Sequence, residues 1–221
     1  MNYLSQYMGQ IIEIEISGKK IITGKLIEYG SDIVVVFNGR NFFYVPLLHI
    51  IHIKKSENTE NEIITVAPSP IGKDSKLISF EKTLTNALGI FVETYITGNQ
   101  SIYGYITQIQ KDYILFYSPA FKTLLIPITH LKWIVPHLDK RPYNVNNNLM
   151  NSSKVALADT FEEQIKKLIG EVVLFDLGKN SDKIGLIKNF ENNMVELITG
   201  DGQTVFLNLF HIKSIHGSKI V

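Results

Sequence analysis

Short stretches that alternate apolar and polar residues recur along the chain and predict β-strands. The clearest runs from Ile11 to Ile16, where isoleucines and glutamates alternate. Successive side chains of a strand point to opposite faces, so these isoleucines are expected to face a core and the glutamates the solvent. The counterparts of these isoleucines later in the chain are Val92, Thr94 and Ile96, and then Val173, Phe175 and Leu177.

Three segments share this pattern and align with one another, at residues 3–54, 80–135 and 159–216. The same residue types recur in them at spacings of 80 or 81 residues. A histidine recurs once in each segment, and each of these three histidines begins a His-[Ile/Leu]-x-x-Ile pattern. The nine anchor residues are Gly9, Gly24, His49, Gly89, Gly104, His130, Gly170, Gly185 and His211. Three matching anchors in three copies indicate an internal triplication.

The segments between the copies, residues 55–79 and 136–158, are predicted to be exposed linkers. The first holds a polar, acidic run and two prolines, and the second an asparagine cluster. Such compositions are typical of connecting chain. Within the first linker, Ile63 to Val66 is interpreted either as an extra strand or as a loop with a buried apolar foot.

Each copy is predicted to begin with a short helix and to continue with five strands. Ser79 is the expected N-cap of the second helix, and Asp159, with Glu162 in a capping box, that of the third. The glycines at 9, 89 and 170 are expected to end the helices. A glycine in the middle of each second strand indicates a sharp bend or close backbone packing. The fourth strand runs into Pro46, Pro127 or Asn208, where a strand end or an edge is expected.

A helix followed by five short strands in about 50 residues, with a bent second strand, resembles the Sm-like barrel. The resulting fold prediction is a mainly β chain of three tandem small five-stranded barrels, each preceded by a short α-helix. Each barrel is small for an independent core, so the three are expected to pack together or to oligomerise.

Composition narrows the class of protein. Charged residues make up 19% of the chain and the net charge is +1, which gives no electrostatic reason for a nucleic-acid partner. The absence of cysteine excludes disulfides, a thiolate zinc site and a cysteine nucleophile. No apolar run approaches the roughly 20 residues that a membrane helix needs, and no secretory signal is visible.

The recurring histidines are the first candidates for chemistry. His49, His130 and His211 would hold a metal if they converged on one axis. The competing interpretation is that each ring makes a hydrogen bond to backbone at the turn before the fifth strand. No Asp, Glu or Cys recurs beside them, so we expect no metal and no cofactor.

An RNA-binding role is the alternative function. The bacterial Sm-like RNA chaperone, which the barrel pattern resembles, reads uridine with a Lys-His pair at this turn. The residues before the histidines are Leu48, Thr129 and Phe210, and none is basic. Phosphate contacts need lysine or arginine clusters, and none recurs. We therefore expect no nucleic-acid partner, and keep an Sm-like RNA-binding or regulatory module only as the alternative.

The sequence carries no sign of an enzyme. It lacks a Gly-x-Ser-x-Gly motif, a phosphate loop and a His-Glu-x-x-His motif. Asp32 and Asp112 are equivalent, but Asn193 takes their place in the third copy, which a turn residue explains better than a catalytic carboxylate.

Aromatic residues suggest a surface for protein contacts. Neighbouring residues of a strand point to opposite faces, so Phe42 and Phe43 cannot both lie in one thin core. At least one is expected to face another unit or chain. The predicted interaction surface comprises Phe42, Tyr44, Tyr103 and Tyr105; core packing is the competing interpretation.

The end of the third copy resembles spore coat protein B of endospore-forming bacilli. The residues from Asn208 to Ile215 read Asn-Leu-Phe-His-Ile-Lys-Ser-Ile, and all three copies close on the His-[Ile/Leu]-x-x-Ile pattern. The resemblance implies a non-enzymatic structural protein that is synthesised in the mother-cell cytoplasm and assembled into the spore coat or exosporium. Other spore coat proteins are the implied partners.

Two features depart from that family. The chain stops at Val221 without the Ser/Lys/Arg-rich tail that many members carry, and it has Ser17-Gly18-Lys19-Lys20 where they have a Gly-Gly-Pro-Glu turn. Phosphorylation and binding of basic coat proteins, which depend on the tail, are therefore not carried over. Open barrels leave the fourth and fifth strands as edges, so a homo-oligomer through strand edges is expected.

Overall fold

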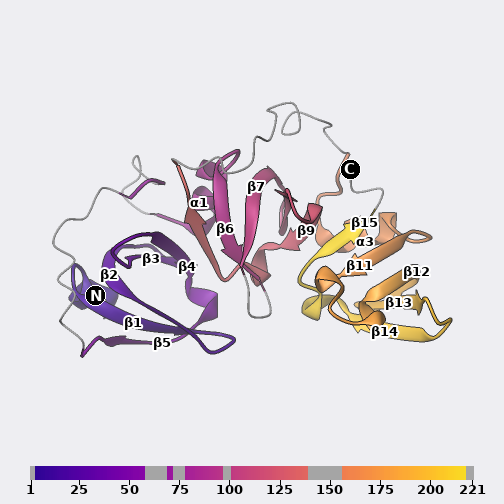
Figure 1. Cartoon of the computed structure of the whole chain (residues 1–221), viewed down its shortest axis with the longest axis horizontal. Coiled ribbons are helices and arrows are strands. Elements are labelled where there is room, and N and C mark those ends of the chain that lie inside the picture. The colour runs from indigo at the N-terminus through magenta and orange to yellow at the C-terminus, as the bar shows by residue number, and fades with distance from the viewer. Residues whose placement is uncertain (1–2, 58–68, 72–77, 97–100, 139–155, 218–221) are drawn as a thin grey trace. The chain divides into compact units, whose positions relative to one another are not determined.

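The computed structural model of the chain describes residues 3–57, 69–71, 78–96, 101–138 and 156–217 (Figure 1). As the sequence predicted, the described part is mainly β. It divides into two compact units rather than three: residues 1–102 with 131–140, and residues 103–130 with 141–221. The described helices are too short to cross a membrane.

The first unit is an antiparallel run of strands in the order β5-β1-β2-β3-β4-β10-β6. Short 3-10 turns, η1 (Tyr3–Tyr7) and η2 (Leu47–His49), and helix α1 (Phe80–Asn86) accompany it. The strands are β1 (Ile11–Ile16), β2 (Lys20–Tyr29), β3 (Ile33–Phe37), β4 (Phe42–Pro46), β5 (Ile50–Lys55), β6 (Phe91–Tyr95) and β10 (Trp133–Pro136).

The second unit is an antiparallel run in the order β14-β13-β12-β11-β15-β9-β8-β7. Helix α3 (Phe161–Lys167) and four 3-10 turns accompany it: η3 (Ile128–His130), η4 (Asp176–Gly178), η5 (Ser181–Lys183) and η6 (Leu209–His211). The strands are β7 (Ile102–Ile109), β8 (Tyr113–Ser118), β9 (Lys122–Pro127), β11 (Val172–Phe175), β12 (Ile184–Glu191), β13 (Met194–Thr199), β14 (Thr204–Asn208) and β15 (Ile215–Gly217).

Strand β1 shows the predicted alternation. Its three even-numbered isoleucines are fully buried, whereas Glu13 and Glu15 face partners on the neighbouring strand β5. The Glu13 carboxylate lies 2.8 Å from the Lys54 ammonium, and Glu15 lies 3.5 Å from the His52 ring. The apolar face therefore drives burial, and the polar face is covered by cross-strand pairs.

The glycines of the second strands are required by close backbone packing. A Cβ atom at Gly24, Gly104 or Gly185 would lie 2.1 to 2.4 Å from a carbonyl oxygen of the paired third strand. Each glycine is followed by a register shift, between Leu26 and Glu28 and at the equivalent places in β7 and β12. The prediction of close packing at these positions is confirmed, and the bulge adds local twist.

The helix ends follow the prediction with one correction. Gly9, Gly89 and Gly170 follow η1, α1 and α3 with φ of 74°, 70° and 87°, the left-handed conformation that glycine adopts freely. The Ser79 side chain caps α1 by accepting from the Lys82 amide. In α3, however, the cap is Thr160, not Asp159, and the capping-box partner is Glu163, not Glu162. The true box lies one residue later because the helix begins at Phe161.

The structure does not show the three separate Sm-like five-stranded barrels that the sequence suggested. The fourth strand of one segment pairs with the fifth strand of the next: β4 with β10, through Tyr44 and Ile134, and β9 with β15, through Leu125 and Ile215. These pairings satisfy strand edges that separate barrels would leave open. They join the copies into open antiparallel runs, and the middle copy is shared between the two units. The boundaries drawn from the repeats stay a prediction.

The cores reflect these junctions. In the first unit, Tyr95 and Trp133 stack with ring centroids 4.6 Å apart and pack into the core of strands β1 to β4. Phe43 meets the Trp133 ring edge-on at 5.9 Å. In the second unit, Tyr113 and Leu125 pack with side chains of the third copy. Each described core thus takes residues from two copies.

Candidate functional site

Equivalent aspartates link each copy to the helix of the next. The Asp32 carboxylate accepts a hydrogen bond from the Phe80 amide at 3.1 Å, and Asp112 accepts one from the Phe161 amide at 2.8 Å. Their own carbonyls accept from the amides of Leu47 and Ile128. Each aspartate is a turn residue whose carboxylate also caps the first amide of a helix, and this structural role accounts for its position in the fold.

The recurrent histidines occupy equivalent turns but have different surroundings. The His49 carbonyl accepts from the Ser17 amide at 2.8 Å, and its Nδ1 lies 3.3 Å from the Ser17 hydroxyl. The His130 Nε2–H donates to the Phe210 carbonyl at 3.0 Å. His211 is exposed. Among the described residues, no group of three or more His, Cys, Asp or Glu side chains is arranged to hold a metal.

The electrostatics of His130 follow from its position. Burial of the ring lowers the pKa of His130 below 6.5, and the hydrogen bond to the Phe210 carbonyl acts in the opposite direction. The Lys213 ammonium adds to the lowering. A neutral ring with its proton on Nε2 is therefore the state that this geometry favours.

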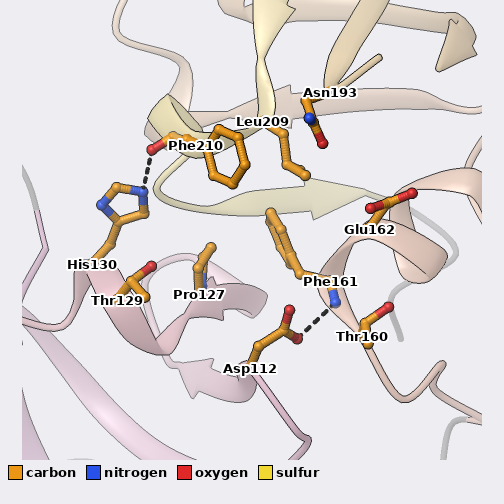
Figure 2. A pocket seen from close by; sticks show the side chains of 10 residues that line it. All are labelled: Asp112, Pro127, Thr129, His130, Thr160, Phe161, Glu162, Asn193, Leu209 and Phe210. Carbon is orange, nitrogen blue, oxygen red and sulfur yellow. Dashed lines mark hydrogen bonds between the residues drawn. The ribbon is translucent and has the colours of Figure 1, made fainter. Parts of the chain in front are cut away.

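A pocket of about 310 Å³ lies beside this histidine in the second unit (Figure 2). Its walls come from the Asp112 turn, the end of β9 with η3, the start of α3, the turn between β12 and β13, and η6. Phe161 and Leu209 give it an apolar floor, and Phe210 lies at its rim beside His130 (Figure 2). The lining residues are Asp112, Pro127, Thr129, His130, Thr160, Phe161, Glu162, Asn193, Leu209 and Phe210.

The pocket lies where residues of the second and third copies meet. Asp112 is engaged by the Phe161 amide, and His130 by the Phe210 carbonyl. Sequence reasoning singled out Asp112 and His130 but not Leu209. The apolar lining is formed by residues that lie far apart in the sequence, so a local sequence pattern does not predict it.

Two buried tyrosines tie connecting chain to the sheets. Tyr113 donates from its hydroxyl to the Ala158 carbonyl at 2.7 Å. The Tyr44 hydroxyl donates to the Ile71 carbonyl at 3.0 Å and accepts from the Ile71 amide at 2.9 Å. Burial raises the pKa of both phenols. Ile71 and Ile78 are buried apolar residues of the first linker, which was predicted to be exposed, whereas Ile63 to Val66 lies outside the described residues.

The predicted aromatic interaction surface is wrong in half of its members. Tyr44 and Tyr105 are buried, since both lie within packed strands. Phe42 is half-buried and packs on Phe37 with centroids 4.6 Å apart, and Tyr103 is 43% exposed. Tyr44 lies opposite Ile134 and Phe43 meets the Trp133 ring, so both contact the next copy of the repeat, whereas Tyr105 lies opposite Tyr117 of its own copy.

Comparison with known proteins places the chain. The described part is a mainly β protein in which successive segments join edge to edge. The chain is 42% identical over 223 residues to the uncharacterized protein YwrJ of Bacillus subtilis (strain 168), an alignment that covers 98% of this chain and 99% of that protein. The chain therefore belongs to the YwrJ family. A family model described as the YwrJ third domain matches residues 160–215.

A more distant similarity supports the resemblance drawn from the sequence. The chain is 27% identical over 138 residues to spore coat protein B of Bacillus subtilis (strain 168). The alignment covers 62% of this chain and 35% of that protein. Spore coat protein B is thus a partial relative, and YwrJ the full-length one.

Proposed function

We propose that the chain is a non-enzymatic structural component of the spore coat or exosporium and acts through protein–protein assembly. The observation that carries the proposal is the similarity to spore coat protein B over 138 residues. In this proposal the protein is synthesised in the mother-cell cytoplasm and then binds other spore coat proteins.

The way the strands join supports an assembly role. Two copies of the same kind of edge contact occur within one chain, at β4–β10 and β9–β15. Side chains reinforce both. The Lys132 ammonium donates to the Ser17 carbonyl at 2.7 Å, and the His216 Nδ1–H donates to the Thr123 carbonyl at 2.9 Å. A chain whose repeats pair through strand edges has the kind of contact by which β-proteins also bind other proteins, which is consistent with a role in assembly.

The turns before the fifth strands favour protein contact over RNA contact. Leu48 and Phe210, which occupy the position of the basic residue in the RNA-binding pattern, are 71% and 67% exposed. Exposed apolar side chains gain free energy when a protein surface covers them and contribute nothing to phosphate neutralisation.

Localisation in a sporulating bacterium tests the proposal. The chain, fused to a fluorescent protein under a mother-cell sporulation promoter, is expressed in Bacillus subtilis, the species of both relatives. We expect a fluorescent shell around the released spore, and recovery of the protein in the coat extract. The fluorescent protein alone, from the same promoter, is the control. Fluorescence that is lost with the mother-cell lysate and absent from purified spores would refute the proposal.

A further inference from the structure

Each unit leaves one strand of the junction type at its edge. Among the described strands, β5 of the first unit is a fifth strand that pairs with β1 alone, and β14 of the second unit is a fourth strand that pairs with β13 alone. The other fourth strands, β4 and β9, are each covered by a fifth strand, β10 or β15. Both edges are labelled in Figure 1. The described strands therefore include one fourth strand and one fifth strand whose outer edges have no strand partner.

The burial of equivalent residues records which fourth strands are covered. Tyr44 and Leu125, which lie opposite the fifth strands, are both 0% exposed. Phe206 stands at the same position in β14, two residues before the strand end, and is 61% exposed. The Phe206 side chain is thus exposed to solvent, whereas its counterparts Tyr44 and Leu125 are buried under a paired strand.

The fifth strands show the same contrast. Ile134 and Ile215, the residues that face the fourth strands, are fully buried. Ile53, their counterpart in β5, is half-buried, and Ile51 in the same strand is 60% exposed. The outer edge of β5 therefore exposes apolar side chains at Ile51 and Ile53, and an open strand edge is a template for another strand.

We propose that β14 of one chain pairs antiparallel with β5 of a second copy, with Phe206 opposite Ile53. The occupant is a second copy because the chain itself already uses this pairing twice, in the same register, between its own copies. The contact is head-to-tail, so each added chain exposes a new edge and the assembly extends into a filament or closes as a ring.

The second internal junction indicates a further contact. There, His130 of the upstream copy donates to the carbonyl of Phe210, the residue before the downstream histidine. The equivalent pair across two chains is His211 and the Leu48 carbonyl. Both residues are exposed in the single chain. The head-to-tail contact thus gives a partner to an anchor histidine that lies in solvent.

This inference gives a mechanism to the assembly role proposed above and is tested with the purified protein. Failure here leaves the spore location untouched, and failure of the localisation leaves self-association intact. Light scattering across the micromolar range should show a mass above that of one chain, 25.1 kDa. Phe206→Lys should return the mass to one chain. Ile21→Lys, at a residue that is 60% exposed on the interior strand β2, is the matched control and should keep the oligomer.

Cysteine cross-linking tests the register, since the chain has no cysteine of its own. Directly opposed strand residues have Cβ atoms about 5 Å apart, within reach of a disulfide after small adjustment. Ile53→Cys mixed with Phe206→Cys should give a mixed dimer under mild oxidation, and Ile21→Cys mixed with Phe206→Cys should not. Three outcomes would overturn the inference. They are a strictly monomeric mass, equal cross-linking in the control mixture, and, in a chain that carries both Ile53→Cys and Phe206→Cys, disulfides formed only within single chains.

Discussion

The Asp112 carboxylate accepts a 2.8 Å hydrogen bond from the backbone amide of Phe161, the first residue of helix α3. The equivalent Asp32 holds Phe80 in the same way at the start of α1. A turn of one copy therefore fixes the helix of the next, and the contact spans 48 or 49 residues of chain. The link couples the folding of neighbouring copies through one side-chain oxygen.

Replacement of Asp112 by alanine should release the start of α3. The Phe161 amide would lose its partner, and loss of a helix-capping acceptor costs about 1 kcal/mol of stability. Amide hydrogen exchange in residues 161–167 should accelerate by about fivefold, the factor that this free energy corresponds to. Asp182→Ala, an exposed carboxylate in η5, is the control and should leave those rates unchanged. Equal protection in the Asp112 variant would contradict the capping role.

Replacement of Gly185 by alanine should destabilise the second unit. The new Cβ would lie 2.2 Å from the Ile198 carbonyl oxygen, so the paired backbone of β13 must move. Overpacking of this kind costs about 1 to 3 kcal/mol. Gly200→Ala is the matched control, because no atom lies within 4 Å of a Cβ built there. Chemical denaturation should lower the free energy of unfolding for the first variant alone; equal stability of both would show that the close contact is dispensable.

The second unit should lose stability as the solution becomes acidic, through His130. Burial lowers the pKa of this ring below 6.5, so the unfolded chain binds its proton at a higher pH than the folded chain. The stabilisation is present in full above pH 6.5 and is lost as the pH falls through the pKa of the folded state. An NMR titration of the ring should give a midpoint below 6.5, and His130→Gln should remove this signal and flatten the stability profile. A midpoint above 6.5 would refute the assignment.

Much of the local structure was predictable because its causes are local. The alternation from Ile11 to Ile16 predicted both faces of β1, and a mid-strand glycine such as Gly24 predicted close backbone packing. The motif that ends at Ile215 led to spore coat protein B, to which comparison finds a distant similarity of 27% identity over 138 residues. Side-chain period and backbone freedom act within a few residues, so the sequence displays them directly.

Some residues of the site were misread because their environment comes from distant chain. Tyr44 was predicted to face partners, but the linker at Ile71 and the strand β10 cover it. Asp159 was expected to cap α3 on local pattern, yet the helix begins where Asp112 holds the Phe161 amide. The pocket beside His130 likewise depends on which turns meet, which no local period encodes.

The sequence by itself determined the strands, their faces, the positions of the glycines and the equivalence of the three segments as a prediction. Only the tertiary structure decided how the strand edges are satisfied. A fourth strand can leave its edge open or pair with the fifth strand of the next copy. Long-range pairing decides between these arrangements, and the same apolar strand sequence is compatible with both. The structure has the second arrangement, in which Tyr44 lies opposite Ile134 and Leu125 lies opposite Ile215. This pairing buries both partners and leaves only β5 and β14 as edges of this type among the described strands.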